Sequence, residues 1–141
     1  MRYFRFEKLV RDEVVYEMMK SGSIPKYRYL EDDEYLERLI QKLGEEVDEV
    51  KMSKKKDMIF AEVVDLQDVL DSILLYLEKS KKDLRHAQRI KKKENGVFEK
   101  RIFVEYVKCN KDSDWVEYYL KNKEKYPEIV METNSNSVCY C

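Results

Sequence analysis

Apolar side chains recur every three or four residues along most of the chain up to about residue 94, a spacing typical of amphipathic helices. The first periodic stretch, 7–20, is followed by Gly22 and Pro25, residue types that commonly lie just beyond the end of a helix. Asp32 and Asp33 are suitable N-caps for a second helix, because an aspartate side chain accepts hydrogen bonds from the first backbone amides. The remaining helices are predicted over the ranges 32–52, 56–78, 80–94 and 115–125.

The fold expected from this pattern is all-α, a helical bundle of about four to five helices. Only three Gly and two Pro interrupt long stretches of Leu, Glu and Lys, which favours helices over strands. The segment 97–107 is rich in β-forming residues, so a short C-terminal strand is compatible with it. We expect one domain over 1–107 and a C-terminal extension over 108–141, consisting of a short helix and then a disordered tail from Thr133 onward.

Glu62 and Asp65 lie on the apolar side of the helix predicted over 56–78. At about 100° per residue they point within roughly 60° of one direction, together with four apolar residues. A carboxylate on a buried face is costly unless it is paired or binds a metal, which argues against a simple solvated acidic surface. Asp68 and Asp71 point away from this side and are expected to face solvent. The four apolar residues are Leu66, Val69, Ile73 and Leu77.

The helix predicted over 32–52 also carries acids close to its apolar side. Glu46 lies at the edge of that side, and Glu49 and then Glu45 lie further out. The lysine-rich sequence 53–57 follows this helix and provides a turn, so the next helix is expected to fold back against it.

Such a turn would bring acids from the two helices together. Glu49 would face Glu62, and Glu46 would face Asp65 about one helical turn, or 3.6 residues, deeper. Carboxylates packed this closely repel one another unless a cation compensates, and a hard divalent cation is the one that prefers oxygen ligands. The sequence therefore predicts a Mg²⁺ site, with Mn²⁺ as a substitute, whose ligands are Glu46, Glu49, Glu62 and Asp65.

Composition limits the context in which such a site can act. The 141 residues favour one domain, and 28 basic against 29 acidic side chains do not indicate a polyanion binder by net charge. No run approaches the roughly 18 apolar residues of a membrane span, and the N-terminus lacks the apolar core of a signal peptide, so we expect a cytoplasmic protein without a membrane partner. Cys109, Cys139 and Cys141 do not form a disulfide framework or, with His86, a zinc motif with paired spacing.

Four ordered segments carry a resemblance to a known family. They are Lys8-Leu9-Val10-Arg11-Asp12, Glu45-Glu46-x-x-Glu49, Glu62-x-x-Asp65 and the segment 91–98, which reads K-K-K-E-N-G-V-F. The acidic pair resembles the E-x-x-E and E-x-x-D motifs of the MazG-like all-α nucleoside triphosphate pyrophosphohydrolases. The first and last segments are similar to K-L-V-R-D and K-K-x-E-R-G-G-F of the phosphoribosyl-ATP pyrophosphohydrolase-like subgroup. Asn95 and Val97 depart from the last motif, and the resemblance covers roughly 3–107.

The resemblance implies magnesium-dependent hydrolysis between the α and β phosphates of a nucleoside triphosphate, giving a monophosphate and pyrophosphate. It also implies a homodimer or a dimer of dimers, with the core completed by oligomerisation and the nucleotide bound in the helix bundle. Lys8 and Arg11, three residues apart on the first predicted helix, are then candidate phosphate ligands. Asp12 is a candidate contact to the metal, to the sugar or to Arg11.

Other roles stay open on the residues alone. Either Glu45 or Glu46 could orient or deprotonate the attacking water. Lys92 and Lys93 fit a substrate site, and they fit a solvated basic face or a nucleic-acid patch equally well. Phe98 could stack on a base, although a core position is the usual role of such an aromatic residue.

Two other functions compete with the enzyme. The first is a non-catalytic nucleotide-sensing or metal-sensing helical module that acts through a protein partner. A pure binding module would not need the full set of four acidic ligands, which favours the enzyme. The second is nucleic-acid binding, against which the near-neutral net charge and the acids on apolar faces both argue. It would use a basic stripe on the helix over 80–94, made of Lys81, Arg85, Arg89 and Lys92.

Overall fold

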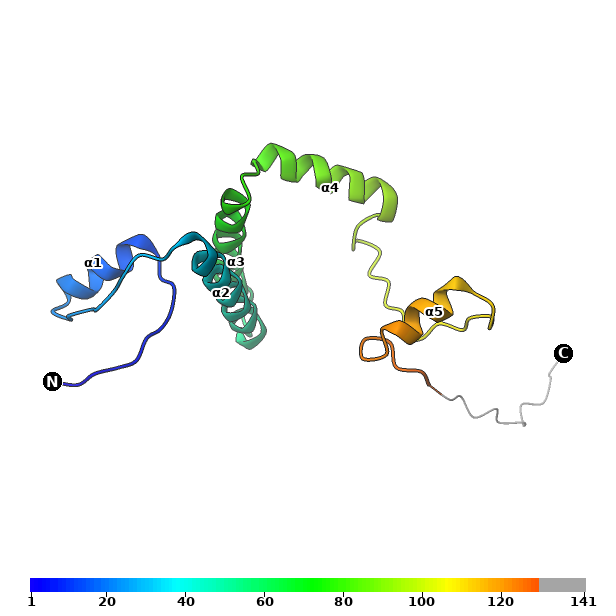
Figure 1. The fold of residues 1–141 in the computed structure, drawn as a ribbon, viewed down its shortest axis with the longest axis horizontal. Helices are drawn as coiled ribbons and strands as arrows, with labels where there is room; N and C mark the ends of the chain where they lie inside the picture. Colours follow the sequence, from blue (N-terminus) through cyan, green and yellow to red (C-terminus); the bar gives the residue numbers. More distant parts are fainter. Residues whose placement is uncertain (130–141) are drawn as a thin grey trace. The chain divides into compact units, whose positions relative to one another are not determined.

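The computed structural model describes residues 1–129 and contains five helices (Figure 1). The all-α prediction is confirmed, whereas the short strand considered for 97–107 is wrong, because residues 1–129 contain no strand. β-forming residues need a neighbouring strand to complete their backbone hydrogen bonds, and the described chain offers none. The helices are α1 (Asp12–Lys20), α2 (Asp32–Met52), α3 (Lys56–Tyr76), α4 (Lys81–Asn95) and α5 (Asp114–Lys121).

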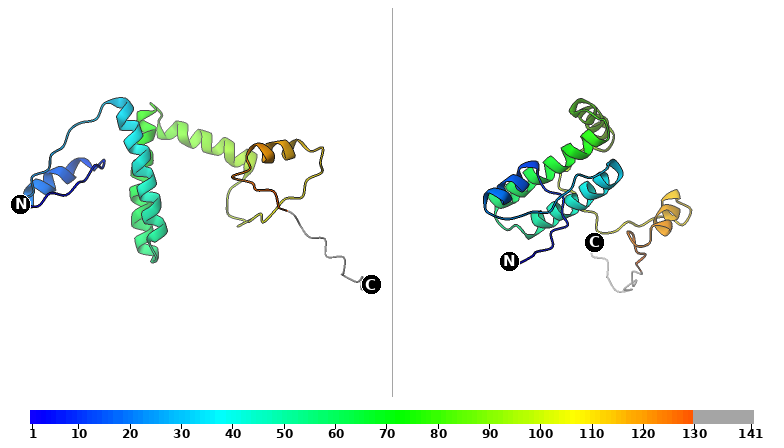
Figure 2. Two further views of the ribbon diagram at one scale, coloured as in Figure 1. Left: turned by 60° about the horizontal axis from the view of Figure 1, so that its bottom comes forward. Right: turned by 60° about the vertical axis from the view of Figure 1, so that its left-hand side comes forward.

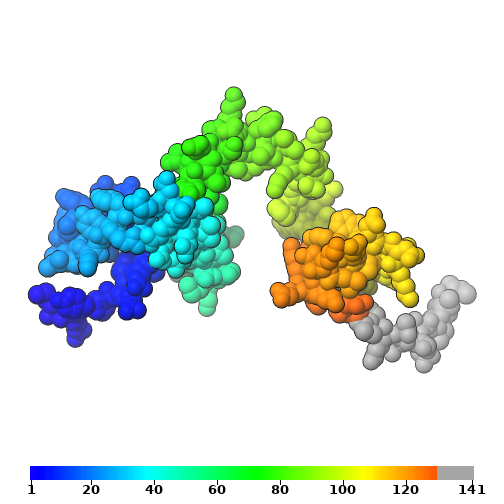
Figure 3. All heavy atoms as spheres, viewed as in Figure 1, coloured from blue at the N-terminus to red at the C-terminus, as the bar shows by residue number. Residues whose placement is uncertain are grey.

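Contacts between residues divide the chain into two units, and the division falls between Gly96 and Val97. This point lies before the boundary expected at residue 107. The first unit contains α1 to α4, and the second contains α5. In Figure 3 the first unit runs from blue to yellow-green and the second from yellow-green to orange. The disordered tail predicted from Thr133, together with Cys139 and Cys141, lies outside the described residues.

The helices α2 and α3 form the packed part of the first unit. They lie side by side in Figures 1 and 2 and run in opposite directions after a short turn. The turn starts where the amide of Ser53 donates to the carbonyl of Glu49 at 3.0 Å, and Lys55 caps α3 in an extended conformation. At the other end of the pair, Tyr35 and Tyr76 meet edge to face with ring centroids 6.3 Å apart. The turn predicted near residue 55 is therefore present.

Few side chains are buried between these two helices. Leu39 of α2 and Val69 of α3 are the buried apolar residues of the described chain, and Glu46 is buried with them. Large apolar side chains on α3 stay exposed, including Phe60 and Leu75, which are 69% and 78% exposed. A single chain thus leaves apolar surface on α3 uncovered, and the core completed by oligomerisation stays a prediction.

The N-terminal segment does not follow the expected helix. We predicted a helix from residue 7, but α1 begins only at Asp12, and Arg11 is its extended N-cap. Residues 1–11 are not helical, and Glu7 has a positive φ of 46°. Lys8 and Arg11 therefore lie before the first helix rather than on it. Both side chains form ion pairs with acids of the α2–α3 pair, Lys8 with Glu45 and Arg11 with Asp65.

The remaining helices begin with local caps. Ser80 and Asp83 form a capping box at α4, in which the Ser80 hydroxyl accepts from the Asp83 amide at 3.1 Å and the Asp83 carboxylate accepts from the Ser80 amide at 2.9 Å. Gly96 follows α4 with a φ of 77°, a conformation that favours glycine. In the second unit, the Ser113 hydroxyl accepts from the Trp115 amide at 3.4 Å at the start of α5. None of the helices in residues 1–129 is both long and apolar enough to cross a bilayer.

Candidate functional site

Three carboxylates converge where α2 faces α3. Glu46 and Glu49 come from α2 and Glu62 from α3, and one oxygen of each lies within 4.8 Å of the others. The two glutamates of α2 share a face because residues three apart are neighbours on a helix. The turn at residues 53–55 then brings the first part of α3 back toward them. We call Glu46, Glu49 and Glu62 the carboxylate cluster.

Burial differs among the members of the carboxylate cluster. Glu46 is only 4% exposed, whereas Glu49 and Glu62 are half-buried. The Glu46 carboxylate forms an ion pair with Lys42, one turn earlier on α2, in which Oε1 of Glu46 lies 2.7 Å from Nζ of Lys42. A buried carboxylate needs such a partner, because its unpaired charge would lose the solvation that water provides. The remaining two members have no ion-pair partner among residues 1–129, so the carboxylate cluster keeps an excess of negative charge.

Burial and the neighbouring acids both raise the pKa of Glu62. Loss of solvent raises the pKa of Glu62 above its ordinary value, and a hydrogen bond with Glu49 and the charges of Glu49, Asp65 and Glu46 raise it further. Each of these effects disfavours the ionised form. A positive charge placed among the three acids would remove the same repulsion. The three acids of the carboxylate cluster are thus residues that could hold a cation.

Asp65, the fourth predicted ligand, is engaged elsewhere. Its carboxylate accepts the guanidinium of Arg11, and a second nitrogen of the same guanidinium donates to Asp68 at 2.7 Å. Both hydrogen bonds raise the pKa of Arg11, and the bond to Asp68 has the larger effect. The expectation that Asp68 simply faces solvent is therefore incomplete, because this exposed acid has a charged partner. Asp71 likewise pairs with Lys81 of α4.

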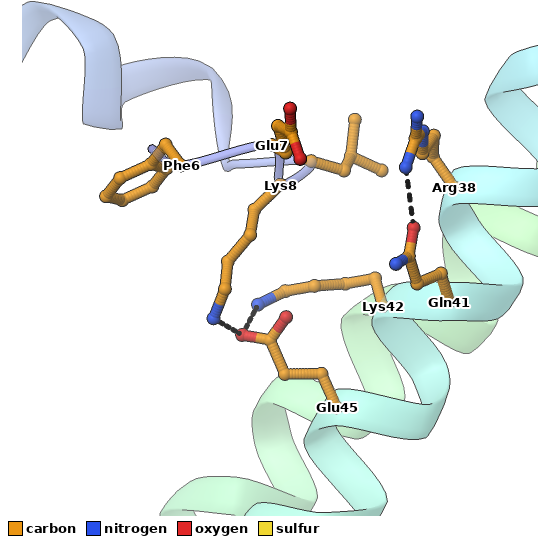
Figure 4. Close-up of a pocket in the computed structure, with 8 residues that line it drawn as sticks. Phe6, Glu7, Lys8, Arg38, Gln41, Lys42 and Glu45 are labelled. Carbon is orange, nitrogen blue, oxygen red and sulfur yellow. Dashed lines mark hydrogen bonds and ion pairs between the residues drawn. The ribbon is translucent and has the colours of Figure 1, made fainter. Parts of the chain in front are cut away.

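Glu45 is not a member of the carboxylate cluster and instead lines a hollow beside α2 (Figure 4). Its Oε1 accepts the ammonium of Lys8 at 2.9 Å and that of Lys42 at 3.2 Å. The hydrogen bond from Lys8 is the main reason that the pKa of Glu45 is lowered, and Lys42 adds to it against the effect of burial. The hollow has a volume of about 250 Å³, and Phe6 and Arg38 also line it. Glu45 and Glu46, though adjacent in sequence, therefore have different surroundings.

The other predicted substrate ligands are exposed. Asp12 opens α1, and Lys92 and Lys93 lie in the last turn of α4; none of these three forms an ion pair within the described part of the chain. Phe98 belongs to the second unit and is 98% exposed, so it has no core position within the described chain.

Lys42 is the residue of this site that the sequence analysis missed. Burial lowers its pKa, but hydrogen bonds with Glu46 and Glu45 outweigh that effect and raise the pKa above the ordinary lysine value. The signal was available, because Lys42 precedes Glu46 by four residues and Glu45 by three, the spacings at which helical side chains meet.

The donor set of the carboxylate cluster suits a hard divalent cation. Oxygens that bind one Mg²⁺ at 2.0–2.1 Å in octahedral geometry lie about 2.9 Å apart when adjacent and about 4.2 Å apart when opposite, so oxygens within 4.8 Å of one another would have to move closer to share one ion. Mg²⁺ is commonly held by a few carboxylates and completes its shell with water and substrate phosphates. Three acids from two helices leave room for such ligands.

Comparison with known proteins adds no relative. No family model matches the chain, and neither the curated proteins nor the solved structures contain a match. The resemblance to the MazG-like family therefore depends on the four short segments alone.

Proposed function

We propose that this protein is a magnesium-dependent nucleotide pyrophosphohydrolase that cleaves a nucleoside triphosphate between its α and β phosphates. The observation that carries the proposal is the convergence of Glu46, Glu49 and Glu62 from two antiparallel helices. Nothing in a two-helix turn requires three acids at one point, and their mutual repulsion is unfavourable unless a cation is bound. The order and spacing of these acids match the motifs that the family resemblance describes.

In this proposal Glu46, Glu49 and Glu62 hold the divalent cation, and Asp65 joins them when its bond with Arg11 is exchanged. A bound Mg²⁺ would neutralise phosphate oxygens and lower the pKa of a coordinated water. Arg11 and Lys8 would bind the phosphates after exchanging their present ion pairs, which Arg11 makes with Asp65 and Lys8 with Glu45. Positioning and charge neutralisation account for most of the catalysis of phosphoryl transfer.

The hydrolysis needs one group to accept a proton from the attacking water. The water oxygen bonds to the α phosphorus, the bond from that phosphorus to the bridging oxygen breaks, and pyrophosphate leaves. Of the two predicted bases, Glu46 lies in the carboxylate cluster, whereas Glu45 is bound by two lysines in the hollow. Glu46 is itself bound by Lys42 and serves as a cation ligand in this proposal, so both Glu45 and Glu46 stay candidates for the proton acceptor.

The exposed apolar side chains of α3 support the second part of the proposal, a homodimer or a dimer of dimers. Phe60 and Val64, one turn apart on α3, are both exposed in the single chain, and this apolar pair is where we place the contact with a second copy. The cytoplasm, where nucleoside triphosphates are abundant, is the compartment in which we place this activity.

A product assay tests the proposed reaction. A panel of canonical and modified nucleoside triphosphates is incubated with the protein and Mg²⁺, and the products are separated. We expect monophosphate and pyrophosphate in equal amounts, with no turnover in excess EDTA. Diphosphate and phosphate, or no turnover of any nucleotide, would refute the proposal. Binding of nucleotide without turnover would favour the non-catalytic sensor.

The matched control for this assay is Glu37, an exposed acid on α2, the helix that carries Glu49. Glu49→Gln should remove the activity, whereas Glu37→Gln should retain it, because Glu37 is exposed on α2 and is not a member of the carboxylate cluster.

A further inference from the structure

Lys42 contacts both the carboxylate cluster and the hollow beside it. Its ammonium lies 2.7 Å from Glu46 and 3.2 Å from Glu45, and only 24% of its side chain is exposed. Lys8 reaches the same oxygen of Glu45 from the N-terminal segment, at 2.9 Å (Figure 4). One cation therefore contacts a buried acid of the cluster and also the acid that lines the hollow.

The contact with Glu46 is useful only while the carboxylate cluster holds no cation. A buried carboxylate without a counter-charge is strongly unfavourable, and among residues 1–129 Lys42 is the cation that pairs with Glu46. A divalent cation bound by Glu46 would itself compensate this charge. It would also repel an ammonium a few ångströms away, since the interaction energy scales with the product of the charges. The two cations therefore compete for Glu46.

The hollow offers the displaced ammonium a second place. Lys42 already donates to Oε1 of Glu45 at 3.2 Å, and Lys8 donates to the same oxygen at 2.9 Å, so this one carboxylate serves two ammonium groups. The lining contains three cations, Lys8, Lys42 and Arg38, and two acids, Glu7 and Glu45. Arg38 also pairs with Glu34 at 3.6 Å and Glu7 with Arg5 at 3.7 Å, which leaves Lys8 and Lys42 to share the carboxylate of Glu45. Once a divalent cation compensates Glu46, these two ammonium groups carry one positive charge more than their shared acid, and an anion from outside can bind it.

The size of the hollow limits what that anion can be. Its volume of about 250 Å³ is below the roughly 300–1,000 Å³ of pockets that enclose a drug-sized ligand. A phosphate group fits this description better than a whole nucleotide does. Phosphate oxygens also accept charge-assisted hydrogen bonds from lysine, which are stronger than neutral ones.

We propose that Lys42 is a substrate-binding residue that neutralises Glu46 until a divalent cation replaces it, and that then binds a terminal phosphate group of the nucleotide in the hollow. The inference rests on the proposed function and adds to it a coupling between the two ligands. The metal frees the lysine for the phosphate, and the phosphate keeps the lysine away from the metal. Lys42 thus makes the binding of each ligand favour the binding of the other.

Titration with the metal alone tests the competition. Mn²⁺ is titrated by calorimetry into the wild type, Lys42→Met, Lys42→Arg and the control Lys51→Met. Lys51 pairs with Asp48 on the same helix at 2.8 Å, away from the carboxylate cluster. We expect Lys42→Met to bind Mn²⁺ several-fold more tightly than the wild type. Lys42→Arg and Lys51→Met should bind Mn²⁺ as the wild type does. Weaker binding by Lys42→Met would overturn the proposal, because Lys42 would then serve to position Glu46 for the metal.

Titration with a phosphate chain tests the second half. The preformed complex of Mn²⁺ and inorganic triphosphate is titrated into each protein. Loss of one charged hydrogen bond should weaken binding by Lys42→Met by about 10- to 100-fold. Lys42→Arg should stay within about threefold of the wild type, because it keeps the charge. Equal binding by Lys42→Met and wild type would overturn the proposal.

The controls distinguish three outcomes: a variant that does not fold, a wrong proposed function and a wrong role for Lys42. Thermal unfolding in EDTA shows whether each variant folds, and Lys42→Gln replaces Lys42→Met if the latter does not. A wild type that neither binds Mn²⁺ nor releases pyrophosphate would refute the proposed function and this inference together. A wild type that does both, with Lys42→Met behaving like Lys51→Met, would refute the role of Lys42 alone.

Discussion

The ammonium nitrogen of Lys8 lies 2.9 Å from Oε1 of Glu45 and joins the irregular N-terminal segment to the middle of α2. Arg11 makes the equivalent connection to α3 through Asp65 and Asp68. Lys8 and Arg11, which the sequence analysis placed on a helix, therefore connect a non-helical segment to α2 and to α3, the two helices that carry the carboxylate cluster. Because the same cations are candidate phosphate ligands, we expect the position of this segment to depend on substrate binding.

The first prediction concerns this connection. Lys8→Met should speed amide hydrogen exchange in residues 1–11, because the segment loses one of its ion pairs. The global free energy of unfolding should change by less than about 1 kcal/mol, since the side chain of Lys8 is largely exposed. Exchange measured by mass spectrometry checks this, with Lys54→Met as a control in the turn after α2. Unchanged protection of residues 1–11 would show that other contacts hold the segment.

The second prediction concerns Glu49. Glu49→Gln should lower magnesium-dependent pyrophosphate release by at least about 100-fold, which corresponds to roughly 2.7 kcal/mol of lost transition-state stabilisation. In EDTA the same variant should unfold at a higher temperature than the wild type, because one of three repelling acids is neutral. Both effects in one protein would distinguish a metal ligand from a residue that only supports the fold. Turnover at the wild-type rate would exclude Glu49 as a ligand.

The third prediction compares two acids that share one partner. Asp65 and Asp68 both accept the guanidinium of Arg11, but the sequence assigns only Asp65 to the metal. Asp65→Asn should therefore abolish pyrophosphate release, whereas Asp68→Asn should retain most of it. Steady-state rates at saturating Mg²⁺ measure the difference. Equal losses in both variants would mean that Asp65 acts only through Arg11.

The fourth prediction follows from the raised pKa of Glu62. In the window between its ordinary value of 4.5 and the raised folded-state value, the folded protein binds more protons at this group than the unfolded chain does. Rising pH therefore removes stability through Glu62, because the slope of the unfolding free energy has the sign of the unfolded minus the folded proton count.

Glu62→Gln removes this contribution, so the variant should gain stability relative to the wild type as the pH rises above 4.5. Thermal unfolding of both proteins in EDTA across that window checks the difference. A difference that is constant with pH would show that Glu62 has an ordinary pKa in the folded protein.

The sequence predicted the α2–α3 pair well because the signals are local. Helical periodicity and the break after Met52 placed these helices at 32–52 and 56–78, close to the observed Asp32–Met52 and Lys56–Tyr76, although the N-cap of α2 is Glu31 rather than Asp32 or Asp33. Helical spacing and the position of the turn between the helices also determine which parts of α2 and α3 lie opposite each other. Glu46, Glu49 and Glu62 could therefore be expected to meet. Periodicity is informative wherever neighbouring residues on one helix decide the outcome.

The parts that could not be predicted depend on contacts distant in the sequence. Arg11 reaches Asp65 and Asp68, and Lys8 reaches Glu45, so the start of the first helix was misplaced. Such pairings depend on how segments pack, which periodicity does not describe. The strand considered for 97–107 was wrong for a related reason. Strand formation requires a partner strand, which the β-forming residues of this segment do not themselves supply.

The central claim is that Glu46, Glu49 and Glu62 hold a divalent cation, and diffraction from crystals grown with Mn²⁺ tests it most directly. Anomalous scattering locates the manganese without reference to activity. We expect an anomalous peak within coordination distance of carboxylate oxygens from all three glutamates, and its loss in Glu49→Gln. A peak elsewhere in the protein, or none in crystals with saturating Mn²⁺, would contradict the account.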